Sequence, residues 1–112
     1  MSVIEMETTQ TTDDLSRLER LIRLYELGQN SSLMDRVLDK VFAKEAADTQ
    51  AAIERLDIDI QNYETQYGMS SEVFNSQFHA GDLGDNMDFV EWSSLIFMRI
   101  HLQQRLKVLT SK

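Results

Sequence analysis

The amino-acid sequence predicts an all-α protein, and three observations support this prediction. The chain of 112 residues contains no proline, the residue that most strongly ends a helix. It has only four glycines, and apolar residues recur at spacings of three and four over most of its length. We expect an elongated antiparallel hairpin or bundle of one long and one medium helix with two shorter helices, completed by dimerisation.

Residues 1–12 are expected to form an N-terminal arm, because their run of threonines has little preference for a helix. A single helical domain should then occupy residues 13–112. Its first helix is predicted over residues 13–27, where leucine and isoleucine recur at helical spacing and Gly28 provides a natural end.

The long helix is predicted over residues 32–67. Ser31 or Ser32 can cap its first turn, and no helix breaker follows before Gly68. Alanines near its middle would let a partner helix approach closely. We therefore expect the other helices to pack along the apolar seam of this helix.

A short helix is predicted over residues 70–80, followed by a glycine-containing loop and a medium helix over residues 88–110. Ser70 can cap the short helix, and Asp88 with Glu91 three residues later is typical of a capping pair. Basic residues near the end of the medium helix complement its dipole. We expect this helix to run antiparallel along the second half of the long helix.

The medium helix is apolar over much of its circumference, so two packed helices of one chain would leave apolar surface in water. A second copy that completes a four-helix bundle is the simplest cover. We therefore expect a homodimer, or a heterodimer with the same geometry. The candidate residues of its core are Leu95, Ile96, Arg99, Leu102, Leu106 and Leu109.

Arg99 is the charged member of this seam, and a buried arginine requires an acidic partner. Candidates on the long helix are Asp57, Asp59 and Glu64. Such a pair would set the register of the bundle; alternatively, Arg99 would meet a carboxylate of another protein.

The charge of the chain is −8, and it is unevenly distributed. Residues 69–91 contain five acidic residues and no basic one, whereas residues 92–112 contain four basic residues and no acidic one. An acidic protein does not favour binding to nucleic acids or anionic membranes, which attract basic surfaces. No segment approaches the ~20 apolar residues of a membrane span, and the N-terminus lacks the features of a signal peptide. We expect no membrane association and a cytoplasmic location.

No catalytic residue, metal or cofactor is predicted. The chain has no cysteine, no glycine-rich phosphate loop and no HExxH or GxSxG motif. Asp82, Asp85, Asp88 and Glu91 recur at every third position, but this spacing does not fit an EF-hand and is explained by turns and capping. A small metal-dependent enzyme or metal-binding protein that uses these acids and a histidine is the first alternative function.

A second alternative is a nucleic-acid-associated regulator that uses the basic end of the medium helix. The residues concerned are Arg99, His101, Arg105, Lys107 and Lys112. Four positive charges on an acidic protein make a weak site for phosphates, so this alternative ranks below an interaction with another protein.

The segment around the glycine-containing loop is the predicted site of contact with a partner protein. Aromatic residues gather near this loop, where they can serve as core or as anchors for a partner. The loop is acidic, and exposed loops commonly carry function. The candidate partner-binding residues are Phe74, Phe78, Asp82, Leu83, Gly84, Asp85, Phe89 and Trp92.

The same segment carries motifs of a known kind: YGMSSEVF at 67–74, GDLGD at 81–85 and DFVEW at 88–92. With these motifs the chain resembles a group of small prokaryotic helical proteins of unassigned function that occur beside toxin-like proteins, as the antitoxin half of toxin–antitoxin pairs. The resemblance implies a cytoplasmic binding protein whose acidic surface masks a basic toxin. Residues 1–50 lie outside it and show no helix-turn-helix pattern. We therefore expect a non-enzymatic protein–protein interaction module.

Overall fold

The computed structural model describes residues 16–111 and confirms the all-α class. Within these residues there are four helices and no strand: a helical segment at 16–26, α2 at Ser32–Tyr67, α3 at Ser71–His79 and α4 at Met87–Leu109. The chain divides into two compact units at a boundary within α2, between Asp39 and Lys40. The predicted arm at 1–12 and the predicted start of the first helix lie outside the described residues.

In the first unit, the helical segment 16–26 ends next to Gly28, as predicted. Gly28 adopts a φ of +69°, the left-handed conformation that commonly follows the last turn of a helix. The hydroxyl group of Tyr25 donates a hydrogen bond to the carboxylate of Asp35 in the first turn of α2. The end of the first helix is thereby joined to the beginning of the second.

Short polar side chains begin the other three helices. Ser31 and Ser70 each accept a hydrogen bond from the backbone amide three residues later, at 3.1 and 3.2 Å. Helix α4 is capped by Asn86, whose side-chain oxygen accepts a hydrogen bond from the backbone amide of Asp88 at 2.9 Å. The predicted capping role of Asp88 is therefore wrong, because Asn86 performs it and Asp88 already lies inside the helix.

Glycines stop α2 and α3 close to the predicted positions. Gly68 has a φ of +63°, and its amide donates to the carbonyl group four residues earlier at 2.9 Å. Gly81 has a φ of +82° and donates to the carbonyl group of Phe78, while the amide of Asp82 reaches back to Gln77 at 3.0 Å. These two bonds form the Schellman arrangement that closes a helix.

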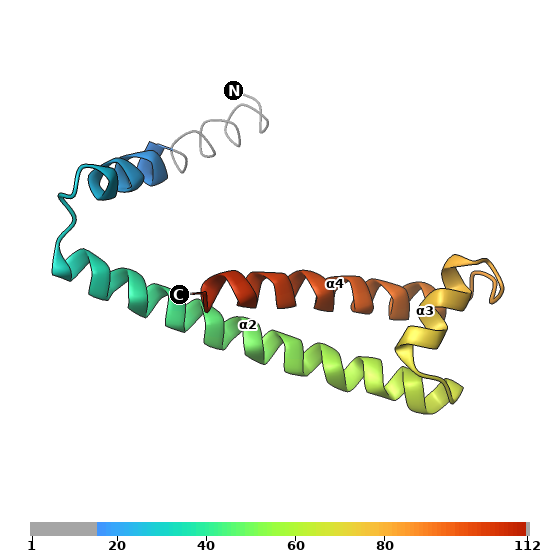
Figure 1. The fold of residues 1–112 in the computed structure, drawn as a ribbon. Helices are drawn as coiled ribbons and strands as arrows, with labels where there is room; N and C mark the ends of the chain where they lie inside the picture. Colours follow the sequence, from blue (N-terminus) through green and yellow to red (C-terminus); the bar gives the residue numbers. More distant parts are fainter. Residues whose placement is uncertain (1–15, 112) are drawn as a thin grey trace, which may run out of the picture. The chain divides into compact units, whose positions relative to one another are not determined.

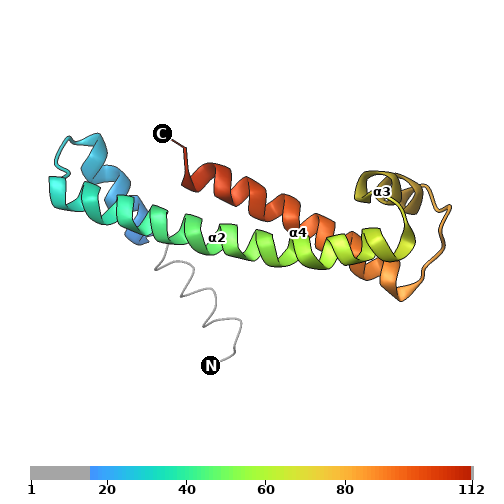
Figure 2. The same cartoon turned by 90° about the horizontal axis from the view of Figure 1, so that it is seen from below.

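Helix α4 runs antiparallel to the second half of α2, as predicted, and α3 crosses at one end of the pair (Figures 1 and 2). The hydroxyl group of Tyr67 donates to the carboxylate of Asp88. Tyr63 lies four residues before Tyr67 on α2, and Trp92 lies four residues after Asp88 on α4. The rings of Tyr63 and Trp92 stack on each other. Equal steps in opposite directions establish the register of the two helices.

The core of the second unit lies where α2, α3 and α4 meet. Its buried apolar side chains are Ile53, Ile60, Phe74, Trp92 and Leu95. Because α2 and α4 form a layer only two helices thick, many other residues of the predicted seams stay half exposed. This layer is the framework on which the candidate site is built.

Replacing Gly68 with alanine should lower the free energy of unfolding by about 1 kcal/mol, because a β-carbon disfavours left-handed backbone. No atom lies within 4 Å of the position that this carbon would occupy, so strain is the expected cause. Gly68→Asn should lose less, since asparagine tolerates this conformation better. Chemical denaturation measures both effects. An alanine variant as stable as the wild type would contradict the prediction.

Candidate functional site

The candidate site lies where α3 crosses the ends of α2 and α4, and a stack of aromatic rings holds it together. The rings of Phe74 and Trp92 are nearly parallel, at an angle of 6°, with centroids 3.8 Å apart. Phe78 stacks on Phe74 at 5.4 Å, and Tyr63 stacks on Trp92 at 5.8 Å. Phe89 packs against Phe74 in a tilted orientation at 5.6 Å. All three helices are joined through these rings.

A chain of hydrogen bonds runs through the same corner. The indole N–H of Trp92, which is fully buried, donates to the hydroxyl oxygen of Ser71 at 3.0 Å. The backbone amide of Ser71 donates to a carboxylate oxygen of Glu64 at 2.8 Å. Ser70 was predicted as a cap, whereas the contact of Ser71 with Trp92 was not predicted. This contact could have been anticipated, because the N–H group of a buried tryptophan requires a nearby hydrogen-bond acceptor.

Two tyrosines of α2 lie beside carboxylates at the beginning of α4. Tyr67 donates to Asp88, and this hydrogen bond is the main cause of the raised pKa of Tyr67. Burial raises the pKa of Tyr63 to about 12, and its hydrogen bond to Glu91 adds to the effect. Helical spacing alone does not predict these contacts of the hydroxyl groups, because the carboxylates belong to another helix.

The eight predicted partner-binding residues differ in exposure. Phe74 and Trp92 have no exposed surface, so their predicted contact role is corrected: they support the corner from inside. The half-buried residues are Phe78, Leu83 and Phe89, and the exposed ones are Asp82, Gly84 and Asp85. The surface that a partner can reach is therefore the acidic loop and the rims of the aromatic stack.

The predicted dimer-core seam of α4 faces α2 of the same chain over part of its length. Leu95 is buried, and the guanidinium group of Arg99 forms an ion pair with Asp57. A second nitrogen of Arg99 lies 3.5 Å from the other carboxylate oxygen of Asp57. Of the three acidic partners predicted for Arg99, the structure selects Asp57. The remaining seam residues are half-buried: Ile96, Leu102, Leu106 and Leu109.

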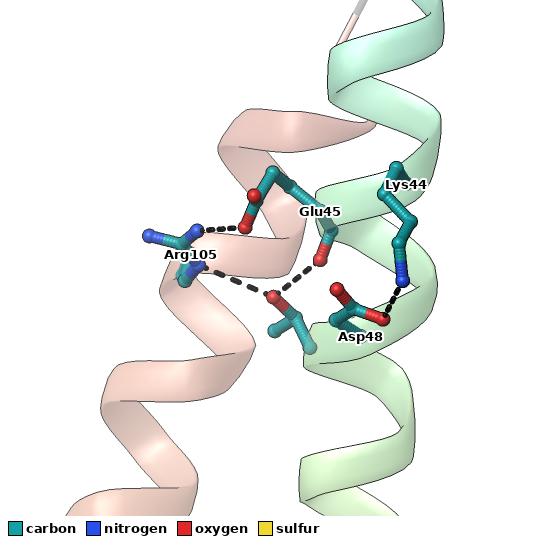
Figure 3. A network of polar contacts seen from close by, with 5 residues as sticks. Lys44, Glu45, Asp48 and Arg105 are labelled. Carbon is teal, nitrogen blue, oxygen red and sulfur yellow. Dashed lines mark hydrogen bonds and ion pairs between the residues drawn. The ribbon is translucent and has the colours of Figure 1, made fainter.

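A second network joins the far end of α4 to α2, and Figure 3 shows Arg105 and Glu45 pointing toward one another. Arg105 forms an ion pair with Glu45 at 2.7 Å and donates to the hydroxyl oxygen of Thr49 at 3.2 Å. The Thr49 hydroxyl, in turn, donates to the backbone carbonyl of Glu45 at 2.7 Å. Arg105 was expected only to complement the helix dipole. Its ion pair could be found only once the register was known.

These two networks change the charge balance of the molecule. Both arginines of the basic segment at 92–112 are paired with carboxylates of α2. Lys107 keeps an exposed side chain, and Lys112 lies outside the described residues. The acidic segment, which we define as residues 69–91, keeps its excess negative charge, with Glu72 and the loop aspartates exposed.

The acids proposed for a metal site are not gathered into one. Among residues 16–111, no three or more acidic or histidine side chains are arranged to hold a metal ion. Asp88 instead accepts a hydrogen bond from Tyr67, and Glu91 lies near the hydroxyl group of Tyr63. Asp82 and Asp85 are exposed on the loop.

Comparison with protein-family models, curated proteins and solved structures finds no match for this chain. None of the helices formed by the described residues combines the length and the apolar character needed to cross a membrane. We therefore infer the function from the surfaces of the chain itself.

Replacing Ser71 with alanine should cost about 1–3 kcal/mol of stability, because the buried indole N–H of Trp92 would lose its acceptor. Ser76→Ala, on the exposed side of the same helix, is the matched control and should stay within about 0.5 kcal/mol of the wild type. In a Trp92→Phe background the cost of Ser71→Ala should shrink. Equal costs in the two backgrounds would refute the role of this hydrogen bond.

Tyr63 should make the protein less stable at high pH. Its pKa is raised from 10.0 to about 12 in the folded chain, so folding favours the neutral phenol. This stabilisation is complete below pH 10 and is lost as the pH rises from about 10 to about 12. Denaturation at a series of pH values should show a smaller decline for Tyr63→Phe, with the other tyrosines accounting for the remainder. Identical declines in the two proteins would contradict the prediction.

Proposed function

We propose that this chain is a non-enzymatic protein–protein interaction module, which forms a homodimer and presents its acidic segment to a basic partner protein. The observation that carries the proposal is the apolar surface that α2 and α4 leave uncovered. Large apolar residues on these two helices are exposed: Val41, Phe42, Ile58, Met87, Val90, Phe97, Met98, Ile100 and Val108. Exposed apolar side chains in this number, on both helices of the layer, favour contact with another protein chain.

The proposed dimer contact is a strip that we name the dimer strip, formed by Ala52, Leu56, Leu102 and Leu109. Ala52 and Leu56 are four residues apart on α2, and the two leucines are seven apart on α4, so each pair shares one face of its helix. All four are half-buried and keep surface for a second copy. The alanine would let two helices approach closely.

The two halves of the dimer strip lie on the same side of the α2–α4 layer. Tyr63, seven residues after Leu56, continues the face of α2, and Glu91, eleven residues before Leu102, continues the face of α4. Tyr63 stacks on Trp92, the residue after Glu91, and the Glu91 carboxylate is near enough to help raise the pKa of Tyr63, so these two faces meet. A second copy packed on this side would complete a four-helix bundle.

The basic partner follows from the charge distribution. The acidic segment at 69–91 contains no basic residue, and the arginines that follow it are bound to α2. An unbalanced negative surface attracts a basic protein and speeds its association. The resemblance of this segment to antitoxins supports the same role, that of an antitoxin-like partner that masks a basic toxin. No specific observation favours the metal-dependent or the nucleic-acid-associated alternative.

Light scattering should report a molar mass about twice the 13.0 kDa of the chain. Ala52→Glu should convert the dimer into a monomer, because it places a charge in the dimer strip while preserving helix propensity. Ile58→Glu is the matched control on a different face of α2, where the wild-type side chain is 61% exposed, and should remain dimeric. A monomeric wild type, or loss of the dimer in both variants, would contradict the proposed contact.

A further inference from the structure

A groove lies where α2, α3 and α4 meet, on a different face of α2 from the dimer strip. Asp57 and Glu64 line the groove. Asp57 directly follows Leu56 of the dimer strip, and Glu64 directly follows Tyr63 on the same face. One position corresponds to a turn of about 100° around the helix, so the groove and the strip lie on different faces. The groove has two hollows, of about 730 and 480 Å³. Both extend between α3 and α4.

The larger hollow is acidic. Asp57, Glu64 and Glu72 line it together with a single cation, Arg99. Arg99 is already paired with Asp57, and one oxygen of Glu64 accepts the amide of Ser71. Glu72 is exposed and has no basic side chain paired with it among the described residues. The hollow therefore keeps an excess of two negative charges.

The smaller hollow is largely apolar. Ile96, Phe97 and Ile100 line it, and the last two side chains are 63% and 47% exposed. Asn75, Ile96 and Ile100 line both hollows, so they form a ridge between them. An acidic hollow and an apolar hollow thus lie side by side, separated by one row of side chains.

We propose that this groove binds an amphipathic α-helix of a basic partner protein, an inference that rests on the proposed function. A lysine or arginine of that helix enters the larger hollow between Glu64 and Glu72, and an apolar side chain one turn away covers Phe97 and Ile100. Side chains three or four positions apart on a helix lie about 5–6 Å from one another. They can therefore straddle the ridge, in the way that ridges of one helix fit grooves of another.

Charge complementarity selects this occupant over a second copy of the same surface. Two copies would bring like charges together at Glu64 and Glu72, which disfavours association. The arginines of α4 are already engaged by Asp57 and Glu45 of their own chain. A basic helix is the occupant that neutralises the larger hollow and covers the smaller one.

The test uses the full chain and a fluorescent designed peptide of two Leu-Lys-Lys-Leu-Leu-Lys-Leu repeats, with binding followed by anisotropy at low ionic strength. A peptide with glutamate in place of lysine is the charge control. We expect saturable binding of the lysine peptide alone. Binding of both peptides with equal affinity, or of neither, would overturn the proposal.

Variants of the chain locate the binding. Glu72→Lys should weaken binding of the lysine peptide by about five- to tenfold, whereas Glu54→Lys makes the same change of charge on exposed α2 surface outside the groove and should have less than about a twofold effect. Ile100→Ser should weaken binding about fivefold, and Val108→Ser, 75% exposed on the same helix, should not. Equal effects within either pair would overturn the proposal. Circular dichroism confirms that each variant is folded.

Molar mass distinguishes this inference from the proposed function. Glu72→Lys should remain a dimer, because the groove and the dimer strip are separate. A change of molar mass in this variant would show that a second copy occupies the groove and would overturn the proposal. A wild-type dimer that fails to bind the lysine peptide would contradict the groove and leave the dimer contact intact.

Discussion

The parallel contact between Phe74 and Trp92 is the interaction on which the rest of the structure depends. It is the place where a short helix of nine residues becomes attached to two long ones. Such a helix is too short to be stable by itself. The contact with Trp92 buries Phe74 completely and thereby stabilises α3. The hydrogen bond from Trp92 to Ser71 sets the orientation of the indole ring. The acidic segment is held in place by these two contacts.

The ion pairs between α2 and α4 matter more for charge distribution than for stability. Exposed pairs of this kind contribute roughly 0–1 kcal/mol, and the side chains of Arg99 and Asp57 are 37% and 44% exposed. Their larger consequence is that the two arginines of α4 are neutralised within the layer. Negative charge is thereby left over at the end where α3 crosses. The same ion pairs that join α2 to α4 therefore also favour a basic partner, because they leave the acidic segment without cations.

The sequence predicted the helices well because their boundaries depend on local chemistry. Serines that cap and glycines with positive φ act within a few residues, and the predicted range 32–67 agrees with α2 at both ends. Tertiary contacts were harder to predict. Helical spacing limited the partner of Arg99 to three acids, but the choice of Asp57 required the register. The local pattern misplaced Asp88, because its carboxylate faces a tyrosine more than twenty residues earlier in the chain.

The sequence groups the aromatic residues of this corner near one another, but it does not predict which of them are buried. Apolar spacing identifies the residues that share a face, and it does not distinguish a core residue from an exposed anchor. Phe74 and Phe78 share one face of α3, yet the first is fully buried and the second half-buried. The difference arises because Trp92 covers Phe74, a contact between distant parts of the chain. Once the groove and the dimer strip are assigned to different faces of α2, a two-fold dimer presents two equivalent grooves. A partner with two basic helices could then occupy both, and its binding would be strengthened by effective concentration without any new contact.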